Sequence, residues 1–110
     1  MLNRTYEGQN CSIARALEIV GERWTLLIVR DVLDGLCRFD QLQQSLGIAR
    51  NVLSDRLNRL VDEGILERRL YSRRPPRYEY RLTKKGRELE AALAALRRWG
   101  DRHASDLARL

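Results

Sequence analysis

The stretch from Phe39 to Glu63 reads FDQLQQSLGIARNVLSDRLNRLVDE. Its first part, Phe39 to Leu46, carries apolar residues at helical spacing, and its second part, Arg50 to Glu63, keeps its leucines on one stripe of a helix. The three residues between them, Gly-Ile-Ala, form a tight turn. Two short helices joined by a glycine-containing turn predict a helix-turn-helix over about residues 39–63.

The second helix of this motif carries polar side chains opposite its leucines. An α-helix fits the major groove of duplex DNA, and the N-terminal part of such a helix can reach the base edges. Arginine and asparagine form bidentate pairs with guanine and adenine. The candidates for reading bases are Arg50, Asn51, Ser54 and Asn58. The candidates for phosphate or backbone contacts are Arg38, Arg56, Arg59 and Lys84. The alternatives are a solvated polar face and a helix-turn-helix that binds protein.

Two β-strand candidates follow the motif, Ile65 to Tyr71 and Tyr78 to Leu82, and they predict a hairpin over about residues 65–82. The six residues between them contain a Pro-Pro pair, which favours an extended finger longer than a two-residue turn. The cations of this loop are Arg73, Arg74 and Arg77. A rigid cationic finger beside a recognition helix is a wing, which lies along phosphates or enters a minor groove. A solubilising hairpin is the alternative.

The charge distribution agrees with a polyanionic partner. The 110 residues carry a net charge of +6, and 33% of them are charged. The segment from Arg50 to Lys85 holds eleven basic and five acidic residues, whereas the rest of the chain balances. Because the whole excess falls in one third of the chain, it makes a concentrated electrostatic footprint of the kind that nucleic acid requires.

Several other classes of protein are excluded by composition. The apolar fraction of 44% suits one folded domain over residues 1–110 and excludes disorder. No apolar run approaches the length of a membrane span or a signal peptide, so we expect no membrane partner and a cytoplasmic location. Two cysteines without a C-x-x-C and a single histidine argue against a zinc site, a disulfide scaffold or acid-base catalysis. We therefore expect no metal, no cofactor, no catalytic residue and no enzymatic activity.

Helices are also predicted on both sides of the motif. Ser12 is expected to cap a first helix over about residues 12–20, and Trp24 to Leu33 is apolar all round, as in a buried helix. Residues 36–38 are a candidate very short strand. Thr83 is expected to cap one continuous last helix, over about residues 84–108. That helix carries a seam at alternating spacings of three and four residues, as in helices that pack against a partner. The seam residues are Leu89, Leu93, Leu96, Trp99, His103 and Leu107.

These elements together predict a fold that is mostly α with a small β-hairpin wing, a winged helix-turn-helix with N- and C-terminal dimerisation helices. A partner subunit would cover the seam of the last helix. The alternative is that this helix packs only on its own domain. In a symmetric dimer the two DNA half-sites should lie about 34 Å apart or a multiple of it.

Five segments of the chain resemble one known family. They are Cys11-Ser12-Ile13, Gly21-Glu22-Arg23-Trp24-Thr25, Arg38-Phe39-Asp40-Gln41-Leu42, Leu53-Ser54-Asp55-Arg56-Leu57, and Tyr71 together with the run from Arg77 to Gly86. In this order they are similar to the HxlR-type branch of the MarR-like winged-helix regulators, over Cys11 to about Trp99. The chain departs from the commonest pattern at Glu22-Arg23, where Gly-Lys is frequent, and at Ala49, where the helix cap is often Ser. The resemblance implies a homodimeric bacterial transcription factor on a palindromic operator.

Cys11 is the candidate redox sensor. It directly precedes the expected first helix, where the helix dipole stabilises a thiolate. The resemblance implies that such a cysteine senses oxidants or electrophiles, whereas a free cysteine can equally be a packing residue. We expect a signal to act on the dimer geometry through Cys11, through a small molecule in a crevice between the N- and C-terminal helices, or not at all. The competing functions are a winged-helix module that binds protein and, less favoured, a thiol-dependent reductase using Cys11.

Overall fold

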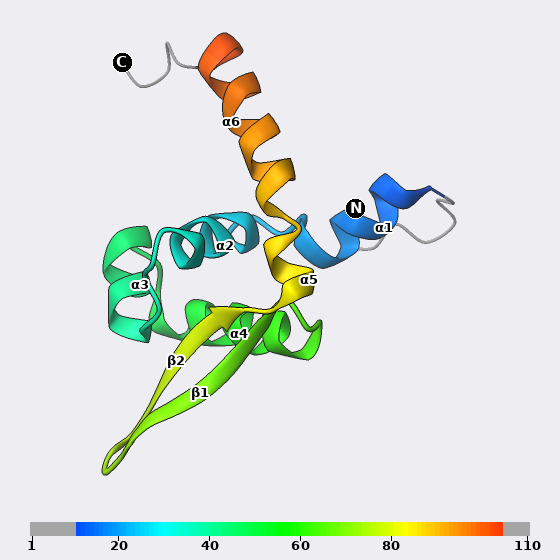
Figure 1. Ribbon diagram of the computed structural model, residues 1–110. Coiled ribbons are helices and arrows are strands. Elements are labelled where there is room, and N and C mark those ends of the chain that lie inside the picture. Colours follow the sequence, from blue (N-terminus) through cyan, green and yellow to red (C-terminus); the bar gives the residue numbers. More distant parts are fainter. Residues whose placement is uncertain (1–10, 105–110) are drawn as a thin grey trace.

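The computed structural model describes residues 11–104, and Figure 1 shows a helical body from which a long hairpin projects. The elements in chain order are α1 (Ser12–Val20), α2 (Thr25–Leu33), α3 (Phe39–Leu46), α4 (Arg50–Asp62), β1 (Leu66–Arg73), β2 (Pro76–Leu82), α5 (Lys84–Arg87) and α6 (Glu90–His103). The predicted class, mostly α with a two-stranded antiparallel hairpin, is confirmed. No helix within this part of the chain is long and apolar enough to cross a bilayer.

The core lies where α2, α3 and α4 meet the base of the hairpin. Ile28, Leu42, Leu53 and Leu57 are completely buried there, and Leu66 joins them from β1. Each such side chain contributes about 1.5–3 kcal/mol by leaving water. The leucine stripe of α4 is thereby turned inward, so the opposite side of that helix must face solvent.

The turn of the helix-turn-helix has the predicted position. Gly47 ends α3 in the left-handed conformation, with φ at 64°, and its N–H donates to the carbonyl of Gln43 at 2.8 Å. Ile48 is buried and anchors the turn to the core. Ala49 is the N-cap residue of α4. Its methyl group cannot accept a hydrogen bond, so α4 has no side-chain cap. A glycine suits the left-handed position because it has no Cβ to clash there.

The hairpin is longer than predicted and its turn is shorter. The strands stay paired to Arg73 and Pro76, so only Arg74 and Pro75 form the turn, and the expected six-residue loop is wrong. Pro76 is tolerated because it is the first residue of its strand, where a missing N–H costs little. A bulge between Leu70 and Ser72 leaves Tyr71 without a partner in the register. The hairpin projects from the helical body, and its turn lies far from the helices (Figure 1).

The single C-terminal helix that was expected is two helices. Thr83 caps α5 as predicted, since its hydroxyl accepts from the Gly86 N–H at 3.0 Å. That hydroxyl also donates to the Gly64 carbonyl at 2.5 Å, which fixes α5 to the start of the hairpin. The helical conformation is interrupted at Glu88 and Leu89, and α6 then extends away from the body of the molecule (Figure 1). The alternating spacing of the apolar residues did not indicate this break.

Two smaller expectations also need correction. The first helix is capped by Cys11 and not by Ser12, which is already its first helical residue. The short strand expected at residues 36–38 is a single bridge between Arg38 and Glu79. The Tyr80 N–H nevertheless donates to the Cys37 carbonyl at 2.7 Å, so this segment is held along the edge of β2.

Candidate nucleic-acid interface

The exposed face of α4 is built by three polar residues. Successive residues of an α-helix are rotated by about 100°, so Asn51, Ser54 and Asn58 lie within one narrow sector opposite the buried leucines. All three are exposed, and their side chains make no hydrogen bond with any residue in the range 11–104. Their donors and acceptors are therefore free for a partner, as base reading requires.

Arg50 lies at the edge of this face and is folded back onto α3. Its guanidinium donates to Gln43 Oε1 at 3.2 Å, lies 3.7 Å from Asp40 Oδ1 and stacks over the Phe39 ring at 4.7 Å. The side chain remains 69% exposed. Because exposed pairs of this kind are worth little, about 0–1 kcal/mol, a phosphate or guanine can compete for the guanidinium.

Arg56 and Arg59 are not brought to the same face. Arg56 Nε lies 2.6 Å from Glu22 Oε2, and Arg59 Nη2 donates to the Glu18 carbonyl of α1 at 2.9 Å. Burial acts to raise the pKa of Glu22, but hydrogen bonds from Arg56 and from the Trp24 N–H, with the charge of Arg56, lower it overall. The hydrogen bond to Glu22 correspondingly raises the pKa of Arg56. Both arginines therefore connect α4 to α1 and to the segment between α1 and α2.

The hairpin carries its cations at the far end. Arg73 and Arg74 are exposed and form no ion pair with another residue in the part of the chain that the structure describes. Arg77 is the second residue of β2, directly after Pro76. Figure 1 shows this end of the hairpin far from the helices, so Arg73 and Arg74 are free to meet a phosphate backbone. Arg77 instead lines a pocket together with residues of α3.

The two remaining backbone candidates lie apart from each other. The Arg38 guanidinium stacks over Tyr71 at 4.2 Å and lies 3.6 Å from Glu79 Oε2. Lys84 is exposed at the start of α5, at the base of the hairpin. Tyr71 was named in the family resemblance but was not among the candidate site residues. Because it lies 33 positions from Arg38, no local pattern could have paired them.

The seam residues of the C-terminal helices separate into two groups. Leu89 and Leu93 are half-buried and pack against the core of their own subunit. Leu96 and Trp99 are 55% and 60% exposed, and the Trp99 ring lies 5.2 Å from the exposed His103 ring. Leu107 lies outside the described residues.

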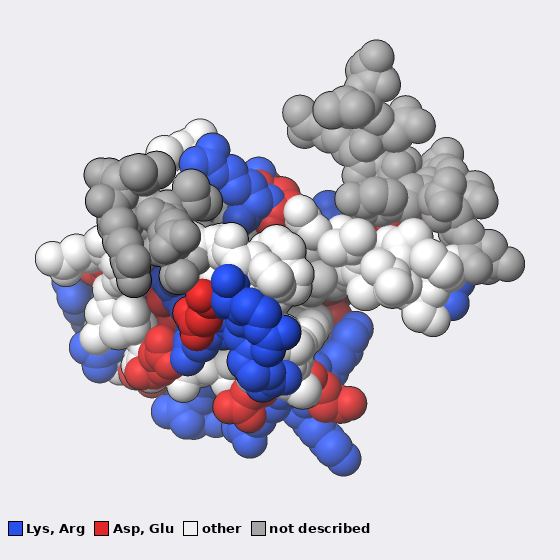
Figure 2. Space-filling model, turned by 90° about the horizontal axis from the view of Figure 1, so that it is seen from above, with Lys and Arg blue, Asp and Glu red and all other residues white. Residues whose placement is uncertain are grey.

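Helix α1 also exposes apolar side chains, which were not among the predicted interface residues of the last helix. Ile13 is 73% exposed, and Leu17 is exposed beside it on the same helix face. Viewed from above, the side of the molecule where α1 lies is mostly uncharged, whereas basic and acidic side chains alternate over the body (Figure 2). These side chains leave apolar surface in water on both α1 and α6.

The two cysteines have different surroundings. Cys11 is exposed, and its Sγ accepts from the Ala14 N–H at 3.3 Å, as a helix cap. Cys37 is half-buried, with its thiol donating to Glu79 Oε2 at 3.6 Å. The predicted place of Cys11 at a helix N-terminus is therefore correct. Among the described residues, no cluster of three His, Cys, Asp or Glu could hold a metal ion.

Comparisons with known proteins agree with this geometry. A family model described as HxlR-like helix-turn-helix matches residues 19–107. The uncharacterized HTH-type transcriptional regulator Rv3095 of Mycobacterium tuberculosis is 52% identical over 102 residues, which cover 93% of this chain. The chain spans only 63% of that relative's length.

Solved structures share the fold. PA1607 superposes with a TM-score of 0.81 at 41% identity, covering 90% of this chain and 69% of its own. The redox regulator HypR in its reduced form superposes with a TM-score of 0.80 at 28% identity, covering 91% of this chain and 100% of its own. The winged-helix class predicted from the sequence is therefore confirmed.

Proposed function

Because the chain belongs to the HxlR-like helix-turn-helix family, we propose that it binds duplex DNA sequence-specifically, as a homodimer, and thereby regulates transcription. The observation that carries this proposal is the free polar face of α4 beside an arginine-tipped hairpin. Asn51, Ser54 and Asn58 read bases in the major groove, with Arg50 released from α3 to join them. Arg73, Arg74 and Arg77 contact the adjacent backbone or minor groove.

The phosphate contacts come mainly from outside α4. Arg38 and Lys84 stand beside the motif and at the base of the wing, and both side chains are exposed. Arg56 and Arg59 are engaged with Glu22 and Glu18, so their part in DNA binding is to hold α4 at its angle. This assignment makes the fit to DNA depend on the position of α1.

The surfaces of α1 and α6 support the proposed homodimer. Ile13, Leu17, Leu96 and Trp99 expose large apolar side chains that one subunit leaves in water. A second copy covers them most simply by a twofold arrangement, in which the same patch meets itself. The two α4 helices are then placed to read two half-sites of a palindrome, about 34 Å or a multiple of it apart.

Cys11 supports a second element of the proposal, a response to oxidants. The cysteine is exposed and caps α1, which is tied to α4 through Arg59. HypR, with which the chain shares its fold, is described as a redox regulator. Oxidation of the thiolate by hydrogen peroxide gives a sulfenic acid and hydroxide, and the larger polar group disturbs the dimer surface beside Ile13.

The test measures DNA binding by fluorescence anisotropy. The first titration uses a random duplex, and the second uses a duplex selected from a random pool. We expect each phosphate contact to add about −0.9 to the slope of log affinity against log salt. A preferred sequence with inverted symmetry supports the homodimer. A response that is flat in salt would favour the protein-binding module, and thiol-disulfide turnover by the purified protein would favour the reductase.

A further inference from the structure

The exposed face of α4 carries amides, a hydroxyl and one carboxylate. Asn51, Ser54 and Asn58 are exposed and make no hydrogen bond with another side chain or backbone group in residues 11–104. Asp55 belongs to the same face, because a helix turns by about 100° per residue and four residues bring it about 40° from Asn51. Arg56 lies 2.5 Å from one oxygen of Asp55, and the Asp55 side chain stays 72% exposed. The face is therefore polar, and its own charge is negative.

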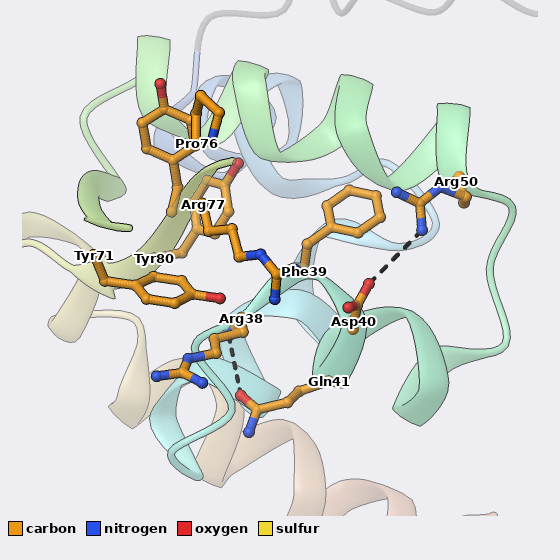
Figure 3. A pocket seen from close by; sticks show the side chains of 10 residues that line it. Arg38, Phe39, Asp40, Gln41, Arg50, Tyr71, Pro76, Arg77 and Tyr80 are labelled. Carbon is orange, nitrogen blue, oxygen red and sulfur yellow. Dashed lines mark hydrogen bonds and ion pairs between the residues drawn. The ribbon is translucent and has the colours of Figure 1, made fainter. Parts of the chain in front are cut away.

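The three arginines of α4 are held away from this face. Arg56 and Arg59 are engaged with the segment after α1 and with α1 itself. Arg50 is turned toward α3, where Figure 3 shows its guanidinium facing Asp40, with Nη1 3.7 Å from Oδ1. Arginine is the usual side chain for reading guanine through O6 and N7. The centre of the face therefore lacks the group that guanine requires.

The chemistry of the face matches adenine instead. The asparagine amide accepts a hydrogen bond from adenine N6 and donates one to N7, so one side chain reads the whole major-groove edge of that base. Guanine presents only acceptors at this edge, and a carboxylate repels acceptors. We propose that Asn51 and Asn58 each recognise an adenine, and that Asp55 between them disfavours guanine.

The spacing of the two asparagines determines the spacing of the two adenines. Asn51 and Asn58 are seven residues apart, which is about 10.5 Å along the helix at a rise of about 1.5 Å per residue. In zinc fingers, residues at similar intervals along the recognition helix contact three successive bases. Asn51, Ser54 and Asn58 then face three successive base pairs. The Ser54 hydroxyl both donates and accepts, so it accommodates several bases at the middle pair.

The predicted half-site has two A·T pairs separated by one pair of relaxed identity. This pattern rests on the proposed function, because it requires α4 to enter the major groove. A twofold dimer presents the pattern twice, in inverted orientation.

The first experiment selects duplexes from a random pool with the full chain and with its variants. We expect an inverted repeat that contains the two adenines in each half-site. Asn51→Ala should relax one adenine and Asn58→Ala the other, each by about tenfold or more in relative affinity. Asp62→Ala is the matched control, because Asp62 is exposed on the same side of α4, one turn beyond Asn58, and should leave the preferred sequence unchanged.

The role of Asp55 has its own variant in the same selection. Asp55→Ala should admit guanine about fivefold more often at one of the three base pairs, because the repulsion between carboxylate and acceptors is gone. If guanine stays as rare as with the parent chain, Asp55 does not discriminate against it.

The second experiment tests the contact at one atom. The base 7-deazaadenine keeps the pairing and the amino group of adenine but has a C–H in place of the N7 acceptor. At the position that Asn51→Ala relaxes, it should weaken binding of the parent chain about fivefold and leave binding of Asn51→Ala unchanged, because that variant has no amide to donate. The same relation should hold for Asn58 at the other adenine.

The outcomes separate this inference from the proposed function. Adenine reading is overturned by a preferred sequence without A·T pairs at these positions, or by a 7-deazaadenine effect that both alanine variants retain. Guanine at these positions would also overturn it and would assign base reading to Arg50 released from α3. Absence of binding to any duplex overturns the proposed function itself.

Discussion

Arg56 of α4 and Glu22, which lies just before α2, form an ion pair in which Nε lies 2.6 Å from Oε2. Their side chains are 25% and 37% exposed. The pair joins the helix proposed to read DNA to the segment that leads out of α1. Since Arg59 binds the Glu18 carbonyl of α1 as well, α4 is attached to that region at two points.

Removing the charge at this connection should cost stability in a pH-dependent way. The folded pKa of Glu22 lies below its ordinary value of 4.5. Its contribution is therefore fully present above about pH 4.5 and is lost as the pH falls through the lower folded pKa. Glu22→Gln should lower the free energy of unfolding by about 0.5–1 kcal/mol at pH 7, because the pair is partly exposed.

Urea unfolding at several pH values measures this effect. The difference between the two proteins should shrink below about pH 4. Glu67→Gln, at an exposed position on β1 without an ion pair in the described part of the chain, is the control and should change little. A difference between Glu22→Gln and the parent protein that is constant with pH would contradict the assignment.

Base reading by Asn51 predicts a loss of discrimination at one position of the operator. Asn51→Ala should lower the preference for one base pair by about 1–3 kcal/mol, roughly tenfold or more, since a bidentate contact carries that much. Selection from a random duplex pool measures it. Arg74→Ala should instead weaken all sequences alike and reduce the salt slope by about 0.9. An unchanged preferred sequence for Asn51→Ala would disprove its role.

The exposed indole of α6 predicts a dimer that one substitution can break. Trp99→Ala should raise the dimer dissociation constant about thirtyfold, which corresponds to about 2 kcal/mol for a central aromatic anchor. Sedimentation equilibrium over a range of concentrations measures it. The neighbouring Arg98→Ala is the control, because that side chain is exposed and charged. Equal self-association of both variants would place the interface elsewhere.

Cys11 predicts an oxidant response that depends on one sulfur. Treatment with hydrogen peroxide should weaken DNA binding of the parent protein and of Cys37→Ser, and leave Cys11→Ser unaffected. Anisotropy before and after treatment, with a thiol reductant to reverse it, measures the effect. If hydrogen peroxide weakens DNA binding of Cys11→Ser as much as that of the parent protein, Cys11 is not the sensor.

A side chain added at Gly86 should clash with the backbone at the base of the wing. A Cβ there would lie 2.2 Å from the Ile65 carbonyl oxygen, which is backbone and cannot move aside easily. Gly86→Ala should therefore destabilise the protein by about 1–3 kcal/mol. Gly100→Ala, inside α6 with no atom within 4 Å, should stabilise that helix by about 0.5–1 kcal/mol. Thermal unfolding distinguishes the two, and a neutral Gly86→Ala would contradict the packing described.

The positions of the helix-turn-helix and of the hairpin followed from the sequence alone. Phe39–Leu46 and Arg50 to the end of α4 were predicted almost to the residue, because helical periodicity and a glycine turn are local properties of the chain. The free polar face of Asn51, Ser54 and Asn58 followed in the same way, since burial of the leucine stripe determines which side of α4 faces water.

Only the tertiary structure decided which side chains met across long separations. The sequence predicted that Arg56 and Arg59 contact phosphates. In the structure they bind Glu22 and the Glu18 carbonyl, which lie 34 and 41 positions away in the chain. The break before α6, the stack of Arg38 on Tyr71 and the pocket around Arg77 arose likewise. Periodicity specifies the orientation of a side chain on its own helix or strand, whereas the choice of its partner depends on how those elements pack together.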